Sequence, residues 1–267
     1  MYTAPFRYIR PRTVAEAEAL FRDCADARYL AGGHTLIPTM KQRLATPSDL
    51  IDIGHIPELS FIRREAAGVV IGAATPHAAV AASPNIQAAI PALAHLAEQI
   101  GDPAVRHKGT LGGSIANNDP AADYPAGVLG LGATVKTTRR AIAADKFFTG
   151  MFATALDSGE IITAVYFPLP RRAAYAKFPN PASRYATVGV FVAVFASAVR
   201  VAVTGAAPCV FRVPEMEAAL AKNFSPDTIA GIVVPSEDLN TDLFASAEYR
   251  AHLVTAMTKR AVAAAML

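Results

Sequence analysis

Two pairs of adjacent glycines, Gly32-Gly33 and Gly112-Gly113, constrain this 267-residue chain more than any other feature. Each pair lies beside an apolar stretch and is followed closely by a small hydroxyl side chain, Thr35 or Ser114. Glycine lets the backbone approach a ligand and exposes N–H groups that can bind phosphate. Because the two pairs are far apart in the sequence, we expect them to hold one elongated ligand with a diphosphate from two sides.

The neighbouring residues favour this interpretation over an ordinary turn, which is the commoner role of a single glycine pair. The first pair precedes residues 35–44, where the pattern predicts a helix with Thr35 as the N-cap and Pro38 in the first turn. A glycine-rich turn that leads into a helix N-terminus favours anion binding. Polar side chains that can hydrogen-bond a ligand follow the second pair, namely Ser114, Asn117, Asn118 and Asp123.

Long stretches around both pairs resemble a known family. Residues 31–59 (AGGHTLIPTMKQRLATPSDLIDIGHIPEL) and 100–126 (IGDPAVRHKGTLGGSIANNDPAADYPA) closely resemble the FAD-binding medium subunit of molybdenum hydroxylases, the xanthine dehydrogenase and carbon monoxide dehydrogenase family. The resemblance continues through GEIITAVYFP, YAKFPNPASRYATVGV and AEYRAHLVTAMTKRAV. It is strongest to medium subunits of the carbon monoxide dehydrogenase type, and it covers nearly the whole chain.

The resemblance implies which residues contact FAD. Asp123, Ile162 and Lys177 align with family positions beside the flavin: an aspartate, an apolar side chain against the ring, and a lysine. A cation there would stabilise anionic reduced flavin. Asn117 is a further hydrogen-bonding candidate. The resemblance also implies that both glycine segments contact the diphosphate region, through Ala31, Gly32, Gly33, His34 and Thr35, and through Thr110, Leu111, Gly112, Gly113 and Ser114.

Several of these residues also have an ordinary structural interpretation. Asp123 would suit the first turn of a helix that starts near residue 119, because a carboxylate there favours the helix dipole. Ile162 fits the core of a strand, and Lys177 fits a solvated surface. Asn117 can cap a turn. The residues alone leave these alternatives open.

Composition and cysteine count argue against several other classes. The net charge of +3 gives no argument for a nucleic-acid partner. The longest apolar region, residues 186–199, is shorter than the roughly 20 residues of a membrane span. No signal-peptide pattern is present, so we expect a cytoplasmic protein, with peripheral association on the inner face of the membrane left open. Cys24 and Cys209 are too few for a four-cysteine iron–sulfur cluster, and no metal site or disulfide is expected.

The order of patterns predicts an α+β fold. Residues 1–57 alternate strand and helix as a small α/β unit, and residues 58–176 are expected to form a larger subdomain with a mixed sheet. By resemblance, these two parts make one FAD-binding domain of the PCMH/vanillyl-alcohol-oxidase type. Residues 177–267 are expected to form a C-terminal antiparallel sheet with helices. Within it, residues 188–195 alternate so that both faces of a strand are apolar, which predicts cover on both sides.

By resemblance, the chain is an oxidoreductase subunit that carries FAD and transfers electrons. In the resembled complexes, an iron–sulfur small subunit with [2Fe–2S] clusters reduces the FAD, and a large subunit with molybdenum cofactor oxidises substrate. Electrons then leave to an external acceptor, and the assembly is a dimer of heterotrimers. No side chain of this chain is then catalytic. Two alternatives stay open: a stand-alone FAD-dependent oxidase or reductase of the related fold, and a flavin-free assembly scaffold.

Overall fold

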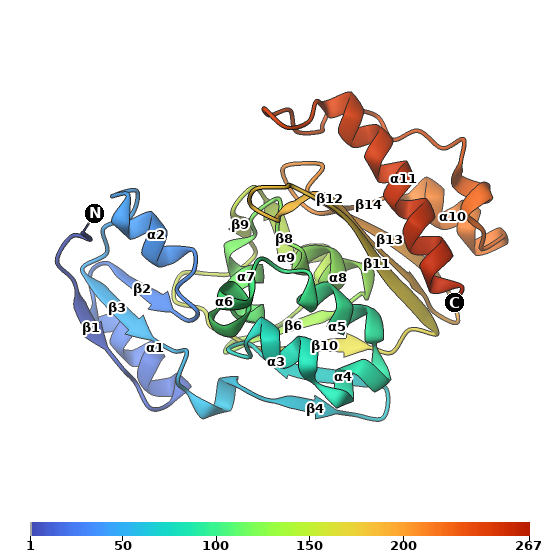
Figure 1. Ribbon diagram of the computed structural model, residues 1–267. Helices are drawn as coiled ribbons and strands as arrows, with labels where there is room; N and C mark the ends of the chain where they lie inside the picture. The colour runs from blue at the N-terminus through green and yellow to red at the C-terminus, as the bar shows by residue number, and fades with distance from the viewer. Residues whose placement is uncertain (1) are drawn as a thin grey trace.

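The protein, a computed structural model that describes residues 2–267, has an α+β fold built on three sheets (Figure 1). A three-stranded sheet lies at the N-terminal end, a five-stranded sheet lies in the middle, and a four-stranded sheet follows. A two-stranded ribbon completes the sheet structure of the described chain. The expected α+β class is confirmed. The long C-terminal helix lies across the outer face of the last sheet, away from the N-terminal part.

The N-terminal sheet is parallel, in the order β1-β3-β2, as expected for a small α/β unit. Thr13 caps the first helix by accepting the N–H of Glu16, whose carboxylate accepts the N–H of Arg12. The second helix is shorter than predicted because Arg43 adopts a left-handed conformation, and the Thr35 side chain makes no capping bond. The elements are β1 (Arg7–Ile9), α1 (Val14–Asp23), β2 (Ala27–Leu30), α2 (Leu36–Lys41) and β3 (Asp49–Asp52).

The middle sheet is antiparallel throughout, in the order β4-β5-β10-β6-β7, so the expected mixed sheet is wrong. The last strand of this part, β10, pairs antiparallel with β5 on one side and with β6 on the other. After the 3₁₀ helix η1 (Pro57–Leu59), the elements are β4 (Ile62–Arg64), β5 (Gly68–Gly72), α3 (His77–Ala82), α4 (Pro84–Ala89), α5 (Pro91–Glu98), α6 (Pro103–Lys108), α7 (Leu111–Asn117), α8 (Tyr124–Gly130), β6 (Thr134–Thr137), β7 (Ala141–Ala143), α9 (Ala144–Phe147), β8 (Phe148–Gly150), β9 (Ala153–Thr154) and β10 (Ile162–Pro168).

Two local predictions in this part need correction. Gly112 and Gly113 lie in the first turn of α7 rather than in a loop, because Thr110 caps that helix through the N–H of Gly113. Asp123 precedes α8 at its N-cap position and makes no side-chain capping bond. A favourable interaction with the helix dipole is therefore not the main role of the Asp123 side chain, which makes its contacts elsewhere.

The C-terminal sheet has the order β11-β12-β13-β14 and is antiparallel. Its second strand is covered on both faces, as predicted. Val190 and Val192 pack toward α11, whereas Phe191 and Ala193 pack into the core of the middle part. The elements are β11 (Arg172–Pro179), β12 (Ala186–Val194), β13 (Val199–Thr204), β14 (Phe211–Arg212), α10 (Pro214–Lys222), the 3₁₀ helix η2 (Pro226–Ile229) and α11 (Ala247–Ala265).

The expected domain boundary at residue 176 falls inside β11. Pro168 ends the middle sheet and Arg172 begins the next one. We propose that the boundary lies in the connection between these two residues, because a boundary there leaves both sheets intact.

The double-sided cover of β12 leads to a stability prediction. Phe191 is fully buried and contributes to the larger core cluster, so Phe191→Ala should lower the free energy of unfolding by about 3–5 kcal/mol. Phe244→Ala is the matched control, because Phe244 is 64% exposed and should change stability by less than about 0.5 kcal/mol. Urea unfolding of both variants measures the difference, and equal midpoints would contradict the proposed core.

Candidate functional site

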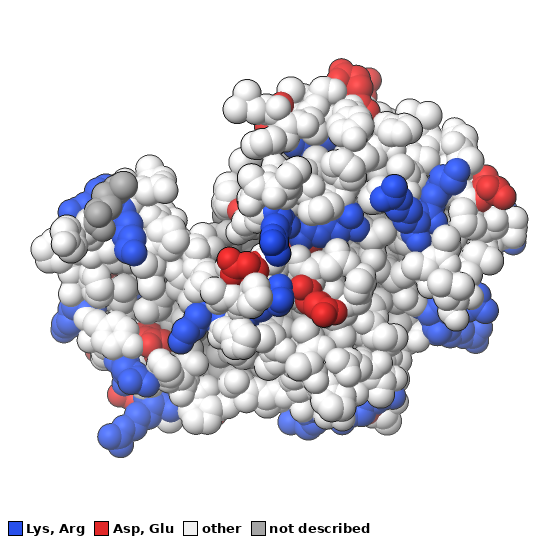
Figure 2. Space-filling view, viewed as in Figure 1, with Lys and Arg blue, Asp and Glu red and all other residues white. Residues whose placement is uncertain are grey.

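A cavity of about 870 Å³ lies between the N-terminal part and the rest of the chain. Figure 2 shows the surface hollowed between these two parts. Its walls come from the end of β2 and the start of α2, from the start of α7, and from the start of β10. The fold therefore brings together both glycine segments, as the sequence predicted.

Most of the predicted site residues line this cavity. Leu111 does not, because it is fully buried in the core beneath α7. Lys177 does not line it either and lies behind Asp123. The predicted residues that line the cavity are Ala31, Gly32, Gly33, His34, Thr35, Thr110, Gly112, Gly113, Ser114, Asn117, Asp123 and Ile162.

Each of the four positions requires glycine for a different physical reason. A side chain at Gly32 would overlap the backbone of Lys108 and Gly109, so the first segment lies directly against the residues just before the second. A side chain at Gly112 would overlap Ala73. Gly33 has a left-handed φ of +71°.

Gly113 differs from the other three because it leaves a bare surface. Apart from the adjacent residues and the backbone of α7 itself, a Cβ at this position would have two neighbours within 4 Å among residues 2–267: the Thr110 hydroxyl at 2.9 Å and the Ala31 methyl group at 4.0 Å. The residue is exposed and lines the cavity. Its missing side chain therefore leaves room for a ligand rather than for protein packing.

The first segment also offers backbone donors. The N–H groups of residues 32–35 have no hydrogen-bond acceptor among residues 2–267. Four adjacent donors at the wall of a cavity suit an anion such as a diphosphate. Their number and position fit the cofactor that the sequence implies.

The second segment does not offer such donors, contrary to the sequence expectation. The N–H of Gly112 donates to Ala73 O, and the N–H groups of Gly113 and Ser114 donate to the hydroxyl and carbonyl of Thr110. These bonds form because the segment is the first turn of a capped helix. The second segment therefore contributes to the cavity wall the bare surface at Gly113 and the side chains of Ser114 and Asn117.

Asp123 and Lys177 form a buried ion pair. The Lys177 Nζ lies 2.9 Å from Asp123 Oδ1 and also donates to Gln99 O at 3.0 Å. The Tyr175 hydroxyl donates to Asp123 Oδ1 at 2.5 Å. Burial raises the pKa of the Asp123 carboxyl, and Lys177 and Tyr175 oppose that effect. The lysine side chain is 2% exposed, so the interpretation as a solvated surface lysine is wrong.

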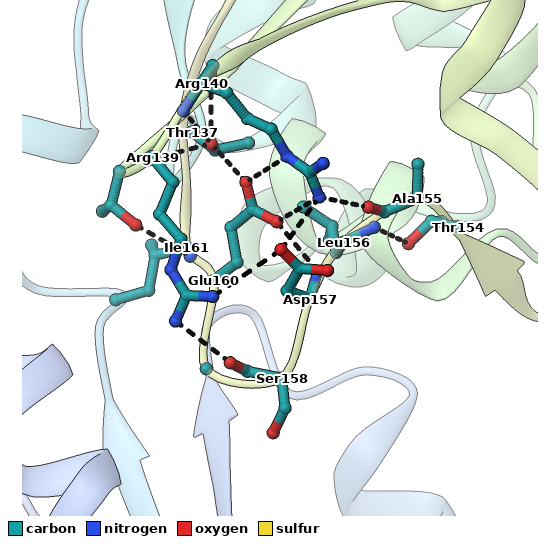
Figure 3. A network of polar contacts seen from close by, with 12 residues as sticks. Thr137, Arg139, Arg140, Thr154, Ala155, Leu156, Asp157, Ser158, Glu160 and Ile161 are labelled. Carbon is teal, nitrogen blue, oxygen red and sulfur yellow. Dashed lines mark hydrogen bonds and ion pairs between the residues drawn. The ribbon is translucent and has the colours of Figure 1, made fainter.

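Sequence reasoning missed Glu160, whose side chain is fully buried at the edge of the cavity (Figure 3). Arg140 donates to Glu160 through Nε at 3.1 Å and Nη2 at 2.9 Å, and Thr137 donates at 2.6 Å. Burial acts to raise the pKa of Glu160, but these bonds and the N–H of Asp157 lower it to about 2. The network fixes the turn before Ile162, and only the three-dimensional structure brings its members together.

The Glu160 network predicts how stability depends on pH. Because the folded-state pKa is lowered, the carboxylate stabilises the fold above about pH 4.5, and this contribution is lost as the pH falls toward about 2. Glu160→Gln should therefore show less loss of unfolding free energy over that range than the parent chain. Glu237→Gln is the control, because Glu237 is exposed and makes no ion pair within residues 2–267. Urea unfolding at several pH values tests this, and equal slopes for Glu160→Gln and the parent would contradict it.

The described chain contains neither a candidate metal site nor a helix that could span a membrane. Within residues 2–267 there is no group of three or more His, Cys, Asp or Glu side chains placed to hold a metal ion. Across the same range, no helix combines the length and the apolar character that crossing a membrane requires.

Comparison with known proteins gives one consistent result. Residues 4–170 match the family described as the FAD binding domain in molybdopterin dehydrogenase. The chain is 37% identical over 281 residues to the carbon monoxide dehydrogenase medium chain of Hydrogenophaga pseudoflava, covering 97% of this chain and 96% of that protein. It is 34% identical over 270 residues to the nicotine 6-hydroxylase medium subunit of Paenarthrobacter nicotinovorans, covering 96% and 95%.

Solved structures agree with the sequence comparison. The carbon monoxide dehydrogenase from Hydrogenophaga pseudoflava superposes with a TM-score of 0.87 at 36% identity, covering 100% of this chain and 99% of that one. Quinoline 2-oxidoreductase from Pseudomonas putida 86 gives 0.89 at 26% identity, covering 99% and 98%. The chain therefore belongs to the family of FAD-binding domains in molybdopterin dehydrogenases, as the FAD-binding medium subunit of an oxidoreductase similar to carbon monoxide dehydrogenase.

Proposed function

We propose that this chain is the electron-transfer subunit of a molybdenum hydroxylase complex. It accepts electrons from the [2Fe–2S] clusters of a small subunit and passes them to an external acceptor, while a large subunit with molybdenum cofactor oxidises the substrate. One observation carries the proposal: a single cavity lined by both glycine segments, with four free N–H donors on one wall. The similarity to medium chains over nearly the whole length supports the same division of labour.

Different residues of the cavity bind different parts of the cofactor. The N–H groups of residues 32–35 hold the diphosphate, and the bare surface of Gly113 lets the cofactor approach α7. The His34 imidazole and the hydroxyl groups of Thr35, Thr110 and Ser114 add polar contacts around it.

The other wall receives the rest of the cofactor. Asp123 and Asn117 accept hydrogen bonds from it, and Ile162 supplies an apolar contact. Leu111 and Lys177 support this wall from behind, through the core and through Asp123. FAD, when bound, supplies the redox chemistry that connects one-electron donors with a two-electron acceptor.

We propose that the partners are an iron–sulfur small subunit and a molybdenum large subunit in a dimer of heterotrimers. The two cysteines of the chain are too few for a four-cysteine cluster, so clusters that reduce the flavin must come from another subunit. The relatives are a medium chain and a medium subunit, which fits a complex of several subunits.

The contribution of Gly113 can be measured directly. Gly113→Val should weaken FAD binding about a hundredfold, roughly 3 kcal/mol, because the side chain fills the bare surface at the cavity and displaces the Thr110 cap. Gly231→Val is the matched control, since a Cβ there has no neighbour within 4 Å. Fluorescence titration with FAD measures both. Unchanged affinity in Gly113→Val would show that this glycine serves only the helix start.

Gly33→Val and Gly112→Val are less suitable tests of binding. The first forces a left-handed backbone onto a branched residue, and the second overlaps Ala73 in the core. Either would reduce FAD binding through the fold itself.

The isolated chain should bind FAD but should not oxidise carbon monoxide, aldehydes or purines. We expect no substrate-dependent loss of flavin absorbance when these compounds are mixed anaerobically with the loaded chain. Adding the iron–sulfur and molybdenum subunits should restore it. Bleaching of the flavin by substrate in the single chain would instead support a stand-alone oxidase, and failure to bind FAD would support a flavin-free scaffold.

A further inference from the structure

His77, the first residue of α3, is a buried histidine without a hydrogen-bond partner. Its side chain lines the cavity, and the residue is only 4% exposed. Neither ring nitrogen has a partner among residues 2–267, and Nδ1 is fully buried. A buried polar group left unpaired costs folding free energy, so such a residue at a cavity wall points to a ligand that completes its bonding.

The imidazole lies directly behind the place where the two glycine segments meet. The backbone N–H of His77 donates to Gly109 O at 3.0 Å. Its Nε2 atom would lie 2.5 Å from a Cβ built on Gly109, so it faces the bare α-carbon of that glycine. Gly109 in turn packs against Gly32 of the first segment. A chain of contacts therefore connects His77 to the free N–H groups of residues 32–35.

The ring is neutral at pH 7. Burial lowers the pKa of His77 to about 4, and the charges of His34 and Arg106 act in the same direction. A neutral imidazole has one donor and one acceptor nitrogen. Because Nδ1 has no hydrogen-bond partner within residues 2–267, the tautomer with its hydrogen on Nε2 avoids an unpaired buried donor at Nδ1.

We propose that His77 is a further cofactor-contacting residue, whose Nε2–H donates to an anionic oxygen of the FAD diphosphate. This inference rests on the proposed function, because it requires FAD in the cavity. It adds a side-chain donor, next to the glycine junction, to the backbone donors of residues 32–35. Nε2, which has no partner within residues 2–267, then gains one in the loaded protein, while Nδ1 stays an unpaired acceptor.

The test compares His77→Leu with Tyr124→Phe in the full chain. Tyr124 is a matched control because its ring lies 5.2 Å from the His77 ring, its hydroxyl is also buried and unpartnered, and it does not line the cavity. His77→Leu should leave the thermal stability of the FAD-free chain unchanged or raised, while affinity for FAD and for ADP falls at least about tenfold. Affinity for riboflavin, which has no phosphate, should stay unchanged.

Tyr124→Phe should keep the parent affinity for FAD and ADP. His77→Gln, which retains a side-chain donor, should recover part of the lost affinity. If His77→Leu does not fold, His77→Met provides the same comparison with an unbranched apolar side chain. FAD affinity in the folded apolar variant equal to that of the parent would overturn the role of His77, as would an equal loss of riboflavin affinity. Failure of the parent chain itself to bind FAD would instead overturn the proposed function.

Discussion

The backbone contact between the two glycine segments is the constraint on which the site depends. Gly32 lies against Lys108 and Gly109 so closely that any side chain there would overlap their main-chain atoms. This contact ties the small N-terminal unit to the middle part at the point where the cavity begins. It also places the free N–H groups of residues 32–35 opposite the start of α7. A side chain at Gly32 would therefore push the two segments apart.

Two ion pairs with buried carboxylates support the remaining walls. Asp123 and Lys177 connect the start of α8 to β11, so the C-terminal sheet supports the cavity from behind. Glu160 and Arg140 fix the turn before β10. Tyr29 donates from β2 to the carbonyl of residue 159 at 3.1 Å, which links that turn to the N-terminal unit. Removing Lys177 would leave the buried Asp123 carboxylate without its cation, which is costly in the protein interior.

Local sequence patterns correctly predicted the features that depend on residues close together in the chain. They did not predict the features that depend on contacts between distant segments. The capping role of Thr13, the double-sided cover of β12 and the convergence of the glycine pairs follow from periodicity and residue type. The mixed sheet was wrong because strand order is set by pairing between distant segments. The burial of Lys177 and the partners of Glu160 were missed for the same reason: no local signal marks a contact that spans 20 or 54 residues.

The charge balance of the cavity favours an anionic ligand despite four carboxylates on its walls. Each carboxylate already has a partner in the protein: Asp102 accepts the N–H of residue 105, Asp119 that of residue 121, and Asp123 and Glu160 have their ion pairs. Unpaired N–H donors, by contrast, lie along the first glycine segment, at residues 32–35. A dianionic diphosphate would satisfy those donors, whereas the two buried carboxylates, Asp123 and Glu160, are already neutralised by Lys177 and Arg140. This distribution of charge is consistent with the proposed function, in which the chain holds the cofactor and another subunit oxidises the substrate.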